Sequence, residues 1–262
     1  MIIDIHTHCY PDEVASWSVS VRSKKFGITP VTDGTVDGLK ASMARSEVDI
    51  SVLHPIALKP EQTVKMNRWS ATVQDKKIIA FGTIHPDLPN WRQEIKWLAD
   101  NGFKGVKFHA DCQGYYVDDP HMLNIYRAVI DASLIILFHS GVDRAFTHPF
   151  MCTPQRLARV LDTFPEATII AAHLGGYRYW DDARRYLLGK DIYLDTAYSI
   201  HELGLEESEQ FIKSHGADKI LFGTDSPWRD QRDDIALIRS FNLSIEDING
   251  ILGGNAKKLL GL

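Results

Sequence analysis

Histidines recur at one kind of position in this sequence, at the end of a short hydrophobic run. The residues at such positions are His6, His8, His54, His85, His109, His139 and His173, and an aspartate, Asp225, ends the last run. Imidazole and carboxylate groups bind divalent metal ions, and imidazole also exchanges protons near neutral pH. The sequence therefore predicts a metal site built from several separate segments.

His6 and His8 form the closest pair among these residues. A spacing of two places both side chains on one face of a strand, so both imidazoles can bind a single ion. His139 and Asp225, from later runs, would complete four ligands and leave room for water. These ligand types favour zinc, although manganese, iron and nickel accept them as well. The structural alternative is that strand-end histidines only hydrogen-bond loop backbone.

The elements that would position these side chains are eight hydrophobic runs. They cover residues 2–5, 49–54, 78–85, 105–109, 134–139, 168–173, 192–196 and 219–225. Each is rich in Ile, Val, Leu or Phe, which is typical of strands buried on both faces. Segments between them have helical character, including 91–102, 121–133, 153–165 and 180–189.

Alternating strands and helices of this number predict an α/β fold, a single-domain (β/α)8 TIM barrel over residues 1–262. In such a barrel the carboxyl ends of the strands meet at one mouth, where the polar residues would gather. A doubly wound open sheet is the alternative, and it is disfavoured because no glycine-rich turn follows the first run.

Two segments lie outside the regular alternation. Residues 9–48 are interpreted as a long loop over the site, because Gly27, Pro30 and Gly34 interrupt any regular element there. Residues 244–262 are expected to form an amphipathic helical tail that starts at Ser244 and closes the outer ring of helices.

Composition limits the classes of function. The chain has 262 residues, 44% of them hydrophobic, and a formal net charge of -5, so it can bury a large core and offers no basic surface to nucleic acid. No run reaches the roughly 20 apolar residues that a membrane-spanning helix requires. Three widely separated cysteines argue against a disulfide framework. We expect a cytoplasmic protein with a small-molecule substrate.

Four residues near the predicted mouth are candidates for substrate contact. His54 and His85 each precede a proline and could instead be structural. Arg144 could pair with a carboxylate, and Tyr177 could line a pocket or only pack between loops. Asp4, which shares a face with His6 by strand parity, is expected to orient an imidazole. Asp195, at the end of the seventh run, is either structural or a substrate contact.

Several motifs together resemble the amidohydrolase superfamily, in its amidohydrolase-related branch of metal-dependent hydrolases and decarboxylases. They are DIHTH, GFKGVKFHADCQGY, LIILFHSG, TIIAAHLGGY, LFGTDSPW and GGNAKKLLGL. The resemblance implies a (β/α)8 barrel in which His6, His8, His139 and Asp225 bind the metal. It implies that His173 either binds a second metal or acts on the substrate.

The number of metal ions is open at this stage. Some members of the superfamily carry a carbamylated lysine on strand four that bridges two metals, and Lys107 is the candidate by position. His109 shares the face of Lys107 by parity, so either side chain could point inward. Branch members with a single metal have no such bridge. We expect one divalent ion and leave open a second one at Lys107, His109 and His173.

Hydrolysis of a small-molecule lactone, ester or amide by metal-activated water is the expected reaction. Asp225 would take the proton of the water, and His173 would stabilise the oxyanion. The alternative is decarboxylation of an unsaturated or aromatic acid with the same ligands. A TatD-like nuclease is disfavoured, because strand four has Lys107 and His109 where such enzymes need a glutamate. An inert metal-binding or ligand-binding barrel is also disfavoured, and a homodimer is left open.

Overall fold

The computed structural model describes residues 1–262, and its strands are all short and parallel. They are β1 (Ile3–Thr7), β2 (Ile50–Leu53), β3 (Ile78–Ala80), β4 (Gly82–Thr83), β5 (Gly105–Phe108), β6 (Ile135–Phe138), β7 (Ile169–Ala171), β8 (Tyr193–Asp195) and β9 (Ile220–Leu221). Neighbours in the chain are neighbours in space, in the orders β1-β2-β3 and β4-β5-β6-β7-β8-β9. Each strand therefore adds to the sheet beside the one before it.

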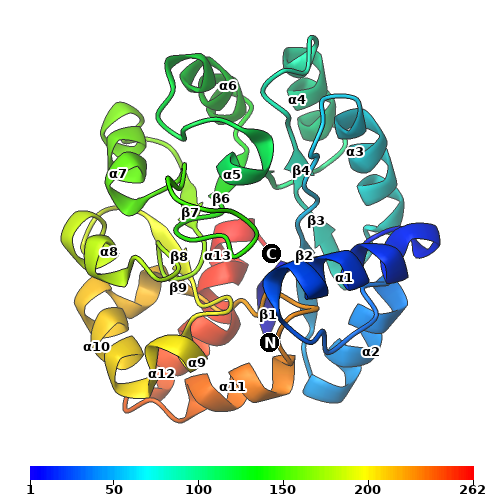
Figure 1. The fold of residues 1–262 in the computed structure, drawn as a ribbon. Coiled ribbons are helices and arrows are strands. Elements are labelled where there is room, and N and C mark those ends of the chain that lie inside the picture. Colours follow the sequence, from blue (N-terminus) through cyan, green and yellow to red (C-terminus); the bar gives the residue numbers. More distant parts are fainter.

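Backbone hydrogen bonds join these two sheets into one closed barrel. Between β3 and β4, the Phe81 N–H donates to Leu53 O over 2.9 Å, a normal ladder distance. At the other junction, Ile5 N donates to Phe222 O over 2.8 Å, and Asp225 N donates to His6 O over 2.8 Å. The run 78–85 is thus one barrel strand interrupted at Phe81, so the predicted eight-stranded barrel is confirmed (Figure 1).

Helices follow the strands and surround the barrel (Figure 1). The α-helices are α1 (Asp12–Phe26), α2 (Val36–Ser46), α3 (Gln62–Val73), α4 (Trp91–Asp100), α5 (Ala110–Gln113), α6 (Pro120–Asp131), α7 (Pro154–Thr163), α8 (Trp180–Tyr186), α9 (Ile200–Leu203), α10 (Leu205–His215), α11 (Gln231–Arg239), α12 (Ile245–Asn249) and α13 (Asn255–Leu260). Two short helical turns, η1 (Ala217–Lys219) and η2 (Gly250–Gly254), complete the set. No helix has both the length and the apolar character needed to cross a membrane.

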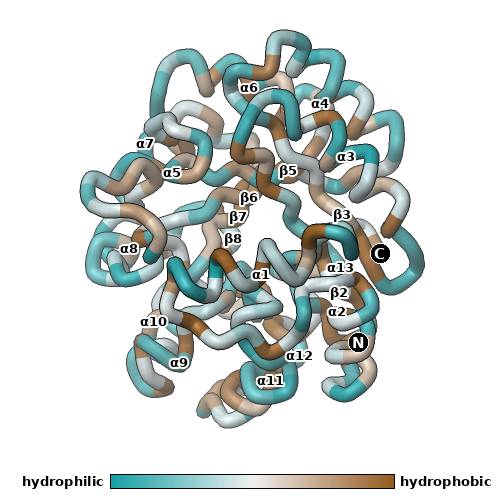
Figure 2. The backbone as a smooth tube through the Cα atoms, turned by 45° about the vertical axis from the view of Figure 1, so that its right-hand side comes forward, coloured by the Kyte–Doolittle hydropathy of each residue, from teal (hydrophilic) through white to brown (hydrophobic).

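The hydrophobic core has two layers. Figure 2 shows brown stretches along the inner strands, with much of the teal on the outer segments. The larger layer lies between the strands and the surrounding helices, and the smaller one fills the barrel with side chains such as Ile5, Phe81 and Leu137. Ala256 and Leu260 of α13 belong to the inner layer. This placement corrects the prediction for the tail, because α13 covers the amino-terminal end of the barrel and is not part of the outer ring.

The segment 9–48 is also different from the prediction. It contains the helices α1 and α2 instead of a long loop. Gly27 ends α1 in a left-handed conformation with φ 68°, so it is a helix cap and not a break within an element. The hydrophobic residues of α1 point in several directions, with Val19 buried and both Val14 and Trp17 exposed. Hydrophobic residues therefore do not recur on one face of α1, and that recurrence is the sequence pattern that predicts a helix.

Candidate active site

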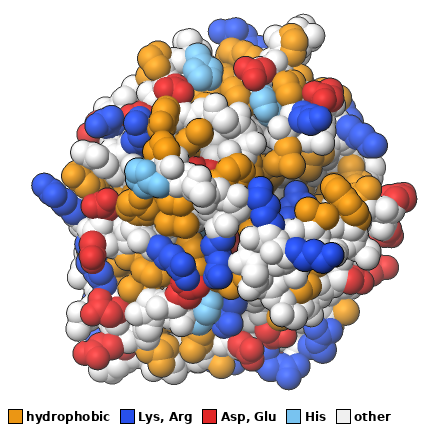
Figure 3. All heavy atoms as spheres, in the orientation of Figure 1, with side chains coloured by type: hydrophobic (Ala, Val, Ile, Leu, Met, Phe, Trp, Pro, Cys, Tyr) orange, Lys and Arg blue, Asp and Glu red, His pale blue; other side chains and the backbone are white.

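A pocket of about 770 Å³ opens at the carboxyl ends of the strands. Of the predicted residues it brings together His6, His8, Lys107, His109, His139, Arg144, His173, Tyr177 and Asp225. Half of its twenty lining residues are hydrophobic. On this face, hydrophobic and basic side chains surround the middle of the molecule (Figure 3). The mixed lining suits a small organic ligand.

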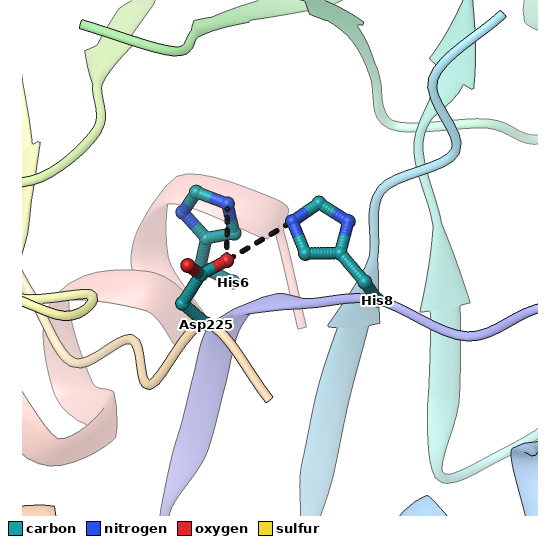
Figure 4. A group of neighbouring side chains, drawn as sticks. All are labelled: His6, His8 and Asp225. Atoms are coloured by element: carbon teal, nitrogen blue, oxygen red, sulfur yellow. Dashed lines mark ion pairs between the residues drawn. The ribbon is translucent and has the colours of Figure 1, made fainter. Parts of the chain in front are cut away.

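His6, His8 and Asp225 form one group of possible metal ligands in the pocket, and their ligand atoms all lie within 4.8 Å of one another. The Oδ1 atom of Asp225 is 3.6 Å from His6 Nε2 and 3.1 Å from His8 Nε2, so both rings face one carboxylate oxygen (Figure 4). β1 and the residue just after it supply the two histidines, and the chain after β9 supplies the aspartate. The closure of the barrel between β9 and β1 therefore assembles this group.

Hydrogen bonds on the far side of each ring determine which nitrogen is free. His6 Nδ1 lies 2.8 Å from Asp195 Oδ2, and His8 Nδ1 lies 2.8 Å from the carbonyl oxygen of His54. Both partners are acceptors, so each Nδ1 carries the hydrogen and each Nε2 presents a lone pair. Burial, reinforced by the nearby Lys107, holds the pKa of His6 well below its usual range. His6 is thus a neutral imidazole, the form that binds metal.

The carboxylate that orients His6 is Asp195 and not Asp4, which corrects the expectation from strand parity. β1 pairs with β2 in an irregular register between Asp4 and Thr7. Asp4 accepts hydrogen bonds from the backbone N–H of His6 and from Thr224 Oγ1, and it reaches no imidazole nitrogen. Its role is to join β1 to the segment after β9.

Lys107 is fully buried beside the same group. Its Nζ lies 3.2 Å from His6 Nε2. Burial lowers the pKa of Lys107, even though the carboxylates of Asp195 and Asp225 oppose the change. Its amine therefore lies next to a lone pair that a metal ion would use.

His173 and His139 lie deeper along the wall of the pocket. His173 Nδ1 is 2.8 Å from the carbonyl oxygen of Ala197, so this nitrogen carries the hydrogen and Nε2 presents a lone pair. That Nε2 is 3.1 Å from His139 Nδ1, which leaves His139 Nε2 buried and without a partner. Burial lowers the pKa of His173 to about 4, so the ring is neutral. His139 is the one predicted ligand that stands apart from the main group.

His139 instead belongs to a second group, with His109 and Asp143. His109 Nε2 is 3.1 Å from Asp143 Oδ2. Burial opposes protonation of His109, but the Cys112 and Asp143 side chains outweigh burial and raise its pKa to about 10. The rings of His109 and His139 are stacked at 4.1 Å with 5° between their planes. In-plane lone pairs of parallel rings do not converge, and His109 Nδ1 already accepts from the Cys112 N–H over 3.4 Å, so this group suits a histidine–carboxylate pair better than a second ion.

Comparison with known proteins identifies the family. The model of the amidohydrolase family matches residues 3–262, which is nearly the whole chain. The chain belongs to the amidohydrolase family. The expected resemblance is thereby confirmed, and with it the expectation of an enzyme. A search of curated proteins found no match.

Solved structures share the fold at low sequence identity. An uncharacterised TIM-barrel protein from Bordetella bronchiseptica has a TM-score of 0.79 and 19% identity, covering 99% of this chain and 98% of that one. The 5-carboxyvanillate decarboxylase of Novosphingobium aromaticivorans, solved with manganese and 4-hydroxy-3-methoxy-5-nitrobenzoic acid, has a TM-score of 0.76 and 16% identity, covering 100% and 96%. The 2,6-dihydroxybenzoate decarboxylase from Rhizobium has a TM-score of 0.72 and 16% identity, covering 99% and 98%.

Within this amidohydrolase barrel, the four predicted substrate contacts divide into two pairs. Arg144 and Tyr177 line the pocket, whereas His54 and His85 do not. His54 is buried beside His6, and its Nε2 lies 2.6 Å from the carbonyl oxygen of Ile5. His85 Nδ1 accepts a hydrogen bond from the Asp87 N–H over 3.2 Å. These contacts indicate that His54 and His85 support the backbone around them and do not contact a ligand in the pocket.

Some residues at the site had no distinct signal in the sequence. Phe26 on α1 lines the pocket, yet the sequence pattern of its segment indicates a loop. Asp143 lies in an irregular stretch after β6, and nothing in its spacing marks it as the partner of His109. Glu202, on α9, contacts Tyr177 from outside the pocket lining. Each of these side chains becomes recognisable only through the neighbour that folding brings to it.

The backbone of the amidohydrolase site is held in an unusual conformation at two of its key residues. His173 and Asp225 have φ angles of 61° and 67°. For a residue with a side chain, the left-handed region costs roughly 1–2 kcal/mol. Such a cost persists where the surrounding structure determines the conformation, and it is commonly found at functional sites. Here the turn directs both side chains into the pocket at the ends of their strands.

Proposed function

We propose that this protein is a metal-dependent decarboxylase of a small aromatic or unsaturated carboxylic acid. The observation that carries the proposal is the pocket: the His6–His8–Asp225 group shares it with aromatic side chains, including Phe26 and Trp228. A planar apolar ring with a carboxylate fits such a lining. The two decarboxylases that share the fold support this reaction. It takes precedence over hydrolysis, which the sequence alone placed first.

We infer that one divalent ion binds at His6 Nε2, His8 Nε2 and Asp225. The hydrogen bonds to Asp195 and to the His54 carbonyl leave these two nitrogens as acceptors, so the donor set fits a metal. His139 is the candidate for a fourth ligand, because its buried Nε2 has no partner. One decarboxylase of this fold was solved with manganese, and zinc suits the same ligands.

When bound, the ion supplies a Lewis acid that holds substrate oxygens and stabilises negative charge. In decarboxylation, the bond between the ring carbon and the carboxylate breaks, CO2 leaves, and the electron pair on carbon takes up a proton. Asp225 Oδ1 faces the two histidines, which leaves Oδ2 as the oxygen that can carry a proton. We therefore assign delivery of that proton to Asp225 Oδ2.

The other residues of the site prepare this step. His173 presents a lone pair at Nε2, which suits positioning of His139 or acceptance of a substrate hydrogen bond better than donation to an oxyanion. The hydrophobic half of the lining leaves a carboxylate in the pocket less solvated than in bulk water, which strengthens the electrostatic interactions around it. Loss of CO2 transfers the negative charge of that carboxylate to the ring carbon, where the proton from Asp225 neutralises it.

The test is turnover by protein depleted of metal and reloaded with Mn²⁺ or with Zn²⁺. A panel of hydroxybenzoates and unsaturated dicarboxylates is assayed for CO2 release, and a panel of lactones, esters and amides is assayed for hydrolysis. In D2O the decarboxylated product should carry one deuterium on the carbon that lost the carboxylate. Asp225→Asn should lower CO2 release at least about 100-fold, the range expected for loss of a proton donor.

Asp233→Asn provides the matched control, because Asp233 is exposed on α11 and forms no ion pair. It should turn over at the rate of the unmodified protein. Hydrolysis of a panel member without CO2 release from any acid would replace decarboxylation with hydrolysis as the function. A homodimer and the identity of the acid both remain predictions to be measured.

A further inference from the structure

The hydroxyl of Tyr177 has its hydrogen committed to a single acceptor. Tyr177 lines the pocket, and its hydroxyl oxygen lies 2.5 Å from Glu202 Oε1. A carboxylate only accepts hydrogen bonds, so the phenolic O–H is the donor. This is the one well-formed hydrogen bond of the hydroxyl, and Arg144 and Arg178 interact with its oxygen more weakly. A substrate hydroxyl that displaces these weaker arginine contacts can therefore donate to the Tyr177 oxygen.

Glu202 is held as a carboxylate by basic side chains. Arg178 donates to it from Nε over 2.9 Å and from Nη2 over 3.2 Å, and Arg144 Nη1 lies 3.5 Å away. Burial opposes ionisation, but the hydrogen bonds from Arg178 and Tyr177 outweigh it and lower the pKa of Glu202. Glu202 therefore acts as a fixed acceptor for the tyrosine hydrogen.

The position of Tyr177 is determined by its backbone as well. Its N–H donates to Ser140 O over 2.9 Å, and its carbonyl accepts from Val142 N over 2.9 Å. A Cβ at the intervening Gly141 would lie 2.2 Å from Tyr177 N, so only glycine permits this contact. Tyr177 is only 4% exposed, and its ring packs edge-on against Trp180, with centroids 5.8 Å apart. The hydroxyl therefore has little freedom to turn elsewhere.

We propose that Tyr177 is a specificity-determining residue that accepts a hydrogen bond from a hydroxyl group of the substrate, and that Glu202 is the positioning residue that imposes this direction. The inference rests on the proposed function only for the class of substrate, an aromatic acid. A substrate hydroxyl donates to the Tyr177 oxygen. A methoxy group at the same place brings only lone pairs to an acceptor, which leaves both groups unsatisfied and costs binding energy.

The experiment measures equilibrium binding, so it does not depend on turnover. The probes are the monohydroxybenzoates and the corresponding methoxybenzoates, titrated calorimetrically into the metal-loaded protein. The unmodified protein should bind at least one hydroxybenzoate about tenfold more tightly than its methoxy counterpart. This factor is the expected free-energy difference between a formed hydrogen bond and a buried acceptor left without a donor. Tyr177→Phe should weaken the hydroxy compound, leave the methoxy compound unchanged and bring the ratio near one.

Glu202→Gln separates positioning from simple structural support. An amide both donates and accepts, so the side chain of this variant can donate to the Tyr177 oxygen and release the tyrosine hydrogen toward the pocket. The methoxy compound should then gain affinity, which loss of structure alone would not produce. Glu206→Gln is the control, since Glu206 is an exposed acid of the adjoining helix α10 and forms no ion pair. It should preserve the ratio.

Two results would overturn the inference: a hydroxy-to-methoxy ratio that survives Tyr177→Phe, or equal weakening of both probes by that variant. Failure of the unmodified protein to bind any of the probes would overturn it together with the aromatic substrate class. Probe binding with the expected ratio but without CO2 release would remove only the decarboxylase assignment. The tyrosine variant alone decides the question if Glu202→Gln proves too unstable for titration.

Discussion

The Nδ1 atom of His6 lies 2.8 Å from Oδ2 of Asp195, and both side chains are almost completely buried. The two residues are 189 positions apart in the chain. This contact leaves His6 Nε2 as the nitrogen that faces the pocket. The same carboxylate accepts the backbone N–H of His173 over 2.8 Å at its other oxygen. One aspartate thus orients two histidines of the site.

Asp195→Asn should weaken metal binding about 10- to 100-fold, the usual cost of removing a carboxylate that supports a ligand histidine. The amide can turn its NH2 toward His6, which would then carry its hydrogen on Nε2, the nitrogen proposed to bind the metal. Competition with a chromophoric chelator measures the affinity. Asp191→Asn is the control, because Asp191 is exposed and pairs only with Lys219 at the surface. Unchanged affinity in Asp195→Asn would contradict the role assigned to this contact.

Lys107→Met tests whether the lysine bridges two metal ions or instead weakens the binding of a single ion by electrostatic repulsion. The amine lies 3.2 Å from His6 Nε2, and an ammonium there repels a cation. We expect the methionine variant to keep one ion per chain and to bind it about tenfold more tightly. A charge this close to a buried group typically changes its binding equilibrium by at least that factor. Elemental analysis and chelator competition provide the two measurements. A drop from two ions to one would instead establish a carbamylated, bridging Lys107.

The free energy of unfolding should depend on pH through Asp234, which pairs with Arg229. Burial raises the pKa of Asp234 from 3.8 to about 6, against the opposing effect of Arg229. Between about pH 4 and about pH 6 the folded protein keeps a proton that the unfolded chain has lost, so stability falls as the pH rises. The contribution is at most about 3 kcal/mol.

Urea unfolding at closely spaced pH values measures this dependence. Asp234→Asn should flatten the curve in that window. Asp233→Asn, on the exposed side of α11, removes only the weaker repulsion from a neighbouring carboxylate and should keep most of the slope. An unchanged slope in Asp234→Asn would show that other groups cause the dependence.

Glu47→Gly should stabilise the fold. Glu47 caps α2 in the left-handed conformation, with φ 56°, and its side chain is exposed and forms no ion pair. Glycine removes a conformational cost of roughly 1–2 kcal/mol and loses about 0.4–1 kcal/mol through the greater freedom of the unfolded chain. The mid-range values leave a net gain of about 0.8 kcal/mol, measurable by denaturant titration. Glu47→Ala keeps the Cβ and should bring no such gain.

Much of the architecture could be predicted from local patterns. Runs of β-branched and aliphatic residues predicted the barrel strands, and Thr153 caps α7 as its sequence indicates, accepting from Arg156 N. The convergence of strand ends predicted that His6, His8 and Asp225 would meet, since parallel strands in a barrel bring their carboxyl ends to one mouth. The prediction failed at α1, whose hydrophobic residues do not follow one face.

By itself, the sequence determined the barrel, its mouth and the histidine-rich composition of that mouth, because these follow from the period of hydrophobic residues and from the order of the strands. Only the tertiary structure decided which nitrogen of each histidine is free, that Asp195 and not Asp4 supports His6, and that Glu202 takes the hydrogen of Tyr177. The physical reason is range. Periodicity is a property of neighbouring residues, whereas hydrogen-bond direction depends on atoms a few ångströms apart that come from distant parts of the chain.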